Sequence, residues 1–219
     1  MNNLMAPPRP RGRPRGFDRD EALESAMRLF WSRGYEATSI SDLTKAMQIT
    51  PPALYSAFGD KKSLFLEAVG RYEQGEGCFA QRALAEEPTA ELAVRRLLLD
   101  AARSFADPKN PRGCMVVLGA TNCTVESTDI FEALAERRRA AENAVRARIA
   151  AGRKAGELPD NADVDALAGM VTAALYGLAV KARDGASRAR LRGIVEQLMM
   201  MWPRREADAA RRRPSSPRG

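Results

Sequence analysis

Residues 39–58 read SISDLTKAMQITPPALYSAF, and this stretch decides the fold. Ser39 and Asp42 have the spacing of a capping box, in which each side chain bonds the backbone N–H group of the other at the start of a helix. Thr50 stands where a second helix needs its cap, and Pro51 takes the first helical position, where an N–H group is not needed. The sequence therefore predicts two short helices joined by the three-residue break 48–50.

Apolar residues recur at helical spacing on both sides of this pair. One stripe runs from Ala22 to Phe30 and stops at Gly34, and Asp60 starts another helix that stops near Gly75. Longer helices are expected over 88–106, 127–156, 161–184 and 187–202, with an apolar segment at 114–120. No alternating strand pattern appears in the sequence, so the predicted fold class is all-α.

Positive charge is concentrated at the two ends of the chain. The 219 residues carry a formal net charge of +7. Arginines dominate residues 1–17, which contain no acid, and residues 203–219, whereas the body between them is near neutral. Cationic ends on a neutral body indicate a polyanionic partner, nucleic acid before membrane.

The composition excludes several classes of function. The chain has no histidine, which removes imidazole bases, His-paired nucleophiles and His-ligated zinc. Its cysteines, Cys78, Cys114 and Cys123, show no C-x-x-C spacing, so we expect neither a thiolate metal site nor a disulfide framework. We therefore expect no catalytic residue, no metal, no cofactor and a reducing compartment.

The sequence also argues against export and membrane insertion. The positive N-terminus is not followed by the apolar stretch of a signal peptide. The longest nearly uncharged apolar run, 168–180, is shorter than the roughly 18 residues that a membrane span needs. We expect a cytoplasmic protein with no membrane partner.

The predicted helix pair has the spacing of a helix-turn-helix, in which one helix braces on the DNA backbone and the second enters the major groove. Spacing alone also fits a structural αα-corner, which any compact helical domain contains. Residues 29–40, LFWSRGYEATSI, and 49–65, ITPPALYSAFGDKKSLF, favour the DNA reader, because they resemble the DNA-binding domain of the tetracycline-repressor (TetR) family. The resemblance covers about residues 17–70. Beyond residue 75 it implies only a helical domain that binds a ligand and dimerises.

The resemblance implies a role for each residue that matches the family motif. Tyr55 and Lys61 would bind phosphates, and Thr38 and Ser39 would bind the backbone of the same half-site. The residues that would face the bases are Thr50, Pro51, Ala53 and Ser56, of which two are apolar, so thymine methyl groups should matter for readout. The chain departs from the family at Gln48, where a glycine is usual in the turn, and at Pro52 and Ala57.

The N-terminal arm offers a second DNA-binding element. Arg11, Arg13 and Arg15 lie in an Arg-Gly-Arg-Pro sequence that is similar to the core of AT-hooks, whose arginines enter a narrow minor groove. The alternative is a solubilising basic tail, which is how we interpret the arginine run at 211–213. The expected organisation is a disordered arm (1–16), a helix-turn-helix domain (17–75), a helical ligand-binding and dimerisation domain (76–203) and a disordered basic tail (204–219).

The last two helical patterns carry more apolar residues than one neighbouring helix covers. In a TetR-like chain these helices would form a four-helix interface with a second subunit. The expected interface residues are Val171, Leu175, Leu178, Leu191, Ile194, Val195, Leu198 and Trp202. The alternative is that they are buried within one chain.

The resemblance also implies a ligand pocket, and the helical domain offers apolar residues with few charged neighbours to line it. The candidates are Phe105, Cys114, Met115, Val116, Leu118, Met170 and Tyr176. Such a lining favours a small apolar or weakly polar effector. Cys114 and Cys123 are also candidates for a thiol sensor, although cysteines more often pack in a core or a pocket wall.

These expectations describe a homodimeric, sequence-specific transcription regulator, a repressor that a ligand releases from a palindromic operator. The ligand must bind the DNA-incompetent arrangement more tightly, since only differential affinity shifts an equilibrium. One alternative is a non-specific DNA-coating protein that binds through its basic arm. A helical enzyme is the other, and the sequence supplies no nucleophile and base for it.

Overall fold

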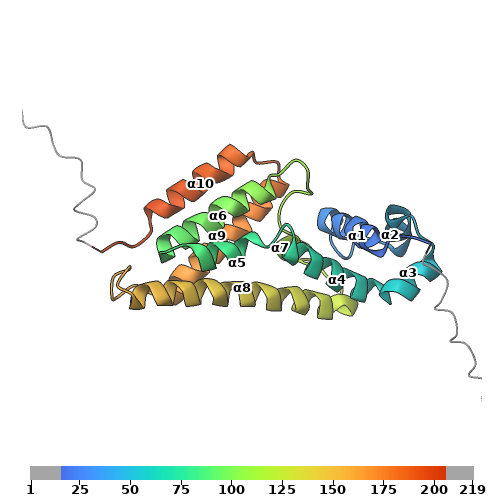
Figure 1. Cartoon of the computed structure of the whole chain (residues 1–219), viewed down its shortest axis with the longest axis horizontal. Helices are drawn as coiled ribbons and strands as arrows, with labels where there is room; N and C mark the ends of the chain where they lie inside the picture. The colour runs from blue at the N-terminus through green and yellow to red at the C-terminus, as the bar shows by residue number, and fades with distance from the viewer. Residues whose placement is uncertain (1–15, 206–219) are drawn as a thin grey trace, which may run out of the picture.

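The computed structural model describes residues 16–205, and within them the chain is helical throughout (Figure 1). The predicted basic arm and basic tail lie outside the described residues, apart from Gly16, Arg204 and Arg205. The N-terminal helices are α1 (Arg19–Arg33), α2 (Ile40–Met47), α3 (Pro51–Phe58) and α4 (Lys61–Gln74). The remaining elements are α5 (Phe79–Glu86), α6 (Ala90–Phe105), α7 (Met115–Leu118), the 3-10 turn η1 (Val125–Ser127), α8 (Thr128–Lys154), α9 (Val164–Arg183) and α10 (Arg188–Met200).

Local capping explains where three of the first four helices begin, namely α1, α2 and α4. Asp18 accepts hydrogen bonds from the N–H groups of Asp20 and Glu21 at the start of α1. The capping box between Ser39 and Asp42 is present in full at the start of α2, and Asp60 accepts from Ser63 N–H at 2.7 Å in the first turn of α4. These side chains bond N–H groups that have no partner inside the helix, so each helix start is set by a few neighbouring residues.

An aromatic cluster in the core joins α1 to α4. Phe30 packs edge-on against Phe65 with ring centroids 5.0 Å apart, and Tyr35 packs against the same ring at 5.1 Å. The next residue of α1, Trp31, packs edge-on against Tyr72 of α4 with ring centroids 4.8 Å apart. Buried aromatic pairs of this geometry add roughly 0.5–1.5 kcal/mol each beyond the burial of their area. The cluster therefore holds the helix pair α2–α3 on a rigid base.

The elements form an elongated molecule with the helix-turn-helix at one end (Figure 1). In Figure 1, α1, α2 and α3 lie at one end, α4 leads away from them, and α6, α9 and α10 lie at the other end, with α8 running along one side. Helix α6 packs against α5, α9 and α10, and α8 packs against α9. The buried apolar residues of both ends form one continuous core.

Three features differ from the sequence expectation. Helix α5 was not predicted, because its N-cap is Cys78, which makes no side-chain hydrogen bond, so no capping residue marks the start of the helix. Ser127 does precede α8 but makes no capping bond, because η1 leads directly into the helix. Helix α9 begins at Val164, three residues later than expected, where Asp163 caps it through Ala166 N–H at 3.0 Å.

Helix α9 is longer than the apolar run that the sequence analysis singled out. Its 20 residues make it, by length and composition, the one helix in residues 16–205 that is apolar enough to cross a membrane, with a mean hydropathy of 1.4. Core helices pass the same test. One side of α9 is buried against α6 and α8, where Ala168, Val171 and Leu178 lie in the core.

Candidate DNA-binding surface

Helix α3 has one buried side and one side open to solvent. Leu54 and Phe58 are 0% and 5% exposed and anchor the helix in the core. Tyr55, in contrast, is 51% exposed, and it is one of the few large hydrophobic side chains left at the surface. A tyrosine held outward by two buried neighbours places its hydroxyl where a partner outside the chain can reach it.

The four predicted base-facing residues lie on the same open side of α3 as Tyr55. Thr50, Pro51 and Ser56 are exposed and Ala53 is half-buried. Thr50 is the N-cap residue as predicted, yet its side chain makes no capping hydrogen bond, so its hydroxyl remains available. Pro52, which the sequence analysis noted only as a departure, is exposed beside them. The structure thus brings together the whole predicted reading face of α3.

The turn before α3 contains a left-handed residue at Gln48, where the family usually has a glycine. Gln48 has φ 54° and ψ 39°, and it is the one non-glycine residue with positive φ among residues 16–205. Its N–H group donates to the carbonyls of Lys45 and Thr44, which closes α2. A side chain in this conformation costs roughly 1–2 kcal/mol, which a glycine would avoid. The turn therefore keeps its geometry without the residue that suits it best.

Thr38 does not fit the predicted role in binding the DNA backbone. Its side chain is fully buried, its hydroxyl donates to the carbonyl of Gly34 at 2.7 Å, and its N–H group donates to Tyr35 O at 3.3 Å. Both donors are therefore used inside the chain. Thr38 fixes the corner between α1 and α2 instead of facing a partner.

Ser39 is exposed, but its polar groups already have partners. Its hydroxyl donates to Asp42 Oδ2 at 2.6 Å and accepts from Asp42 N–H at 3.0 Å, and its own N–H donates to Asp42 Oδ2 at 3.1 Å. These bonds hold the pKa of the Asp42 carboxyl below its ordinary value. Ser39 therefore orients the start of α2, and reaching a phosphate would require it to give up part of the capping box.

Lys61 lies at the start of α4, and its ammonium group sits on an aromatic ring. Its Nζ lies 4.1 Å from the centroid of the Tyr35 ring, a cation–π contact. Burial lowers the pKa of Lys61, while the nearby carboxylate of Glu36 acts in the opposite direction. An ammonium on a ring face keeps its outward N–H bonds, so Lys61 is held in place without being neutralised by a salt bridge. The arm residues Arg11, Arg13 and Arg15 lie outside the described residues.

The predicted dimer face divides into two groups in the structure. Five of its eight residues are at most 4% exposed within the single chain, so their side chains belong to its own core: Val171, Leu178, Leu191, Val195 and Trp202. For these five, the alternative of burial inside one chain is the better description. Leu175, Ile194 and Leu198 are half-buried and remain at the surface.

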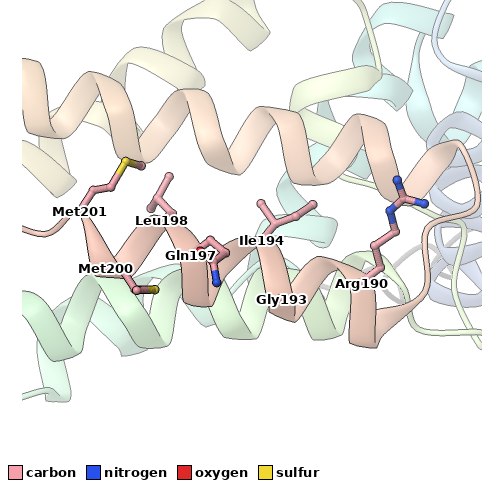
Figure 2. A pocket seen from close by; sticks show the side chains of 7 residues that line it. All are labelled: Arg190, Gly193, Ile194, Gln197, Leu198, Met200 and Met201. Carbon is pink, nitrogen blue, oxygen red and sulfur yellow. The ribbon is translucent and has the colours of Figure 1, made fainter.

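A groove along α10 is lined by two of these three surface residues, Ile194 and Leu198. It extends from Arg190 to Met201 and encloses about 750 Å³ (Figure 2). Met200 and Met201 are 70% and 66% exposed at its end. Sequence reasoning missed Gly193 and Gln197, which complete the lining. Their signal was the spacing 190, 193, 197, 201, which puts them on one side of a helix.

The seven predicted pocket residues lie in two environments. Phe105, Cys114 and Met115 are buried side chains of the core. Val116, Leu118, Met170 and Tyr176 are half-buried and come from α7 and α9. None of the seven lines the α10 groove or the smaller hollow beside Arg153 and Asp160. Cys114 accepts a hydrogen bond from the Tyr72 hydroxyl at 3.4 Å, and burial raises the pKa of its thiol, which disfavours the reactive thiolate.

Known proteins share both ends of this architecture. Residues 22–68 match the family model of bacterial regulatory proteins of the tetR family, and residues 93–198 match that of the tetracyclin repressor-like C-terminal domain. The HTH-type transcriptional repressor ComR of Escherichia coli (strain K12) is 34% identical over 194 residues, which span 88% of this chain and 92% of ComR.

Solved structures of regulators show the same fold. The TetR family regulator CifR, as a cysteine mutant complexed with 26-bp double-strand operator DNA, matches with a TM-score of 0.85 and 41% identity over 88% of this chain and 100% of CifR. PfmR of Thermus thermophilus matches with a TM-score of 0.62 and 28% identity over 86% of this chain and 98% of PfmR. These relatives are transcriptional regulators and not enzymes. With its reading helix, its turn and its helical domain all matched, the chain belongs to the TetR family of bacterial DNA-binding transcriptional regulators.

Proposed function

We propose that the chain is a homodimeric repressor that reads a palindromic operator with α3 and leaves it when a small molecule binds. The observation that carries the proposal is the open face of α3, where Thr50, Tyr55 and Ser56 are exposed while Leu54 and Phe58 hold the helix in the core. Polar, exposed side chains on a firmly anchored helix suit the hydrated edges of a major groove. The operator bound by the related CifR supports a site of this kind.

The phosphate contacts that we assign come from both sides of the reading helix. Tyr55 places a hydroxyl on one strand, and Lys61 places an ammonium group on the same half-site from the start of α4, where the helix dipole also favours an anion. Ser39, the exposed N-cap of α2, supplies a further backbone contact when it releases part of its capping box. The base-facing set is Thr50, Pro51, Ala53 and Ser56, and Arg11, Arg13 and Arg15 of the arm supply minor-groove contacts.

A second copy of the chain is the partner that we propose for α9 and α10. The α10 groove leaves Ile194, Leu198 and Met200 in water, although apolar area of this kind is worth about 25 cal/mol per Å² when it is covered. A closed two-fold dimer covers the same face on both copies and spaces two reading helices for successive major grooves. We place the boundary between the DNA-binding and helical domains at residues 75–76, between the two family-model matches.

The effector that we propose is small and apolar or weakly polar. Val116, Leu118, Met170 and Tyr176 are half-buried apolar or aromatic residues from two elements of the helical domain. They supply an apolar lining with one phenol hydroxyl. Because the reading helices act in the DNA-binding end, the effector must favour an arrangement of the two copies that does not fit the operator.

Selection of genomic DNA fragments on the purified full chain, followed by sequencing, tests the proposal. The expected result is a small set of fragments that share an inverted repeat, bound by a dimer. Tyr55→Phe and Lys61→Ala should each lower affinity by a similar factor for the selected fragment and for unrelated DNA, since phosphates carry no sequence. Lys154→Ala removes an exposed ammonium group from the helical domain and serves as the control.

Lys61→Ala should also reduce the salt slope of binding by about one, because one phosphate contact is lost. An unchanged affinity and an unchanged salt slope would show that Lys61 does not contact the DNA. Arg13→Ala should weaken binding in the same assay. If the fragments recovered share no sequence, the chain coats DNA without specificity and the regulator proposal is wrong.

A further inference from the structure

The DNA-binding end is tied to α9 by one arginine side chain. From the last turn of α9, Arg183 donates from Nη2 to Trp31 O at 2.8 Å and from Nη1 to Ser32 O at 3.0 Å. Its Nε donates to Arg112 O at 2.9 Å. Trp31 and Ser32 lie in the last turn of α1, where carbonyl groups lack partners within the helix. The guanidinium therefore caps the first helix of the DNA-binding domain from a helix about 150 residues later in the chain.

The 109–113 segment makes further hydrogen bonds to both of these helices. Arg112 donates from Nη1 to Ala182 O at 3.3 Å and to Ala186 O at 3.1 Å, which caps the end of α9 in turn. On the other side, Trp31 Nε1 donates to Gly113 O at 3.1 Å. The 109–113 segment is thus bound to α1 and to α9 by hydrogen bonds in which side-chain N–H groups donate to backbone carbonyl oxygens.

Gly113 shows how closely this segment lies on α9. Its φ is +86°, and a Cβ atom there would stand 2.9 Å from Ala179 O and 2.7 Å from Leu118 Cδ1. A backbone carbonyl of a helix does not move aside easily, so the segment cannot slide along α9 without breaking contact. The three parts of the joint, which are the end of α1, the 109–113 segment and the end of α9, therefore move together.

Arg183 makes these bonds without a carboxylate. Among residues 16–205 its guanidinium forms no ion pair, and burial lowers its pKa because the charge is partly removed from water. The residue is exposed overall, so its charge keeps part of its hydration while three of its N–H groups bond backbone carbonyls. Only arginine offers donors in a planar fork that reaches three carbonyls at once, and the ammonium of a lysine has no such fork.

We propose that Arg183 is a positioning residue that fixes the orientation of the helix-turn-helix relative to α9, and thereby sets the half-site spacing that the dimer accepts. The inference rests on the proposed function, in which α9 and α10 meet a second copy. The orientation of each reading helix is then set by a short series of contacts, which runs from the partner copy to α9, from α9 through Arg183 to α1, and so to the helix-turn-helix. Loosening this path leaves the reading face of α3 intact and widens the range of spacings that the two copies tolerate.

The test uses the full chain and a series of duplexes made from the selected fragment. One or two base pairs are inserted or deleted between the half-sites, which rotates one half-site by about 35° per base pair. For wild type we expect tight binding at the native spacing and a steep loss on either side. The measured quantity is the spacing ratio, the affinity for native spacing divided by that for altered spacing.

Arg183→Lys keeps the charge and should lower the spacing ratio by about threefold to thirtyfold, a range that matches measured couplings between sites. Its affinity for an isolated half-site should stay at the wild-type value. Arg183→Ala should act in the same direction at least as strongly. Arg139→Ala is the matched control, because this exposed arginine pairs only with Glu132 of its own helix, and its spacing ratio should equal that of wild type.

Several results would overturn the inference without touching the proposed function. One is an unchanged spacing ratio in Arg183→Lys, and another is an equal loss of affinity at every spacing. Loss of the native helical signal in Arg183→Lys would make Arg183 a folding contact and overturn it as well. If wild type itself showed no preference for the selected fragment, the proposed function would fail first, and that outcome is visible before any variant is made.

Discussion

Helices α3 and α10 are built alike on their buried sides and differently on their exposed sides. Leu54 and Phe58 anchor α3, and Leu191, Val195 and Met199 anchor α10, all at most 5% exposed. Outside, α3 presents hydroxyl groups and prolines, whereas the groove along α10 presents Ile194, Leu198, Met200 and Met201 beside Arg190 and Gln197. The buried side of a helix shows where it sits in the fold, and the exposed side shows what chemistry it can meet. The first surface suits a polar, charged duplex and the second suits another apolar protein face.

Removing an anchor of α3 is the strongest way to break this comparison. Leu54→Ala should destabilise the helix-turn-helix by about 2–5 kcal/mol, because a fully buried leucine leaves a cavity. Urea unfolding followed by circular dichroism measures the loss, and DNA binding should fall with it. Arg192→Ala is the control on α10, since this exposed side chain lies outside the groove and contributes little to the stability of the chain. Equal stability losses in the two variants would contradict the division into buried and exposed sides.

A charge in the α10 groove tests its partner. Ile194→Asp should leave the fold of the single chain intact and weaken the dimer by about 3 kcal/mol or more, because the interface would bury an unpaired carboxylate. Sedimentation velocity over a range of concentrations measures the shift from dimer to monomer. Arg192→Asp is the control, because this exposed residue of α10 lies outside the groove lining. If Ile194→Asp formed dimers over the same concentration range as wild type, the interface would not include this face of α10.

The turn of the helix-turn-helix offers a change in the opposite direction. Gln48→Gly should stabilise the chain by about 1 kcal/mol, because glycine adopts φ 54° without the penalty of a Cβ atom but loses more entropy on folding. We expect a higher midpoint of urea unfolding, with an unchanged slope of the unfolding free energy against urea concentration. Gln48→Ala keeps the Cβ atom and should bring no such gain. If alanine stabilised the chain as much as glycine did, backbone strain at residue 48 would not be the cause.

The smallest predicted effect concerns the contact between the DNA-binding end and the loop before α8. Glu36 accepts from Thr124 N–H at 3.1 Å, and hydrogen bonds from Ser127 and Thr124 hold the pKa of its carboxyl below its ordinary value. A carboxyl with a lowered pKa in the folded state stabilises the fold above its unfolded pKa of about 4.3, and the benefit disappears as the pH falls through the folded value.

Glu36→Gln should therefore cost at most about 0.5 kcal/mol at pH 7, since the group is exposed, and nothing at pH 3. Urea midpoints of both proteins between pH 3 and pH 7 measure the difference. A gap between the two proteins that stayed constant over this range would show that the charge of Glu36 plays no part.

The same contrast explains what the sequence could predict. The bounds of α2 and α3 followed from Ser39, Asp42 and Pro51, because caps act on backbone groups within a few residues. The division of α9 and α10 into buried and exposed residues did not follow, since Leu178 and Ile194 have similar hydrophobicity and only the position of α6 and α8 decides which one is covered. Thr38 was misassigned because its hydroxyl turns back to Gly34, a local bond that the family motif does not reveal. The contact between Arg183 and α1 joins residues too distant in sequence for any local pattern.

Competitive DNA binding at physiological salt tests the central claim, that the exposed face of α3 reads sequence, most directly. A labelled fragment from the genomic selection is titrated off the wild-type protein by unlabelled copies of itself and by an unrelated duplex of equal length. The account predicts that the unrelated duplex competes about a thousandfold less well or worse, as specific regulators require. Equal competition by the two duplexes would contradict it, because binding would then depend on phosphates alone.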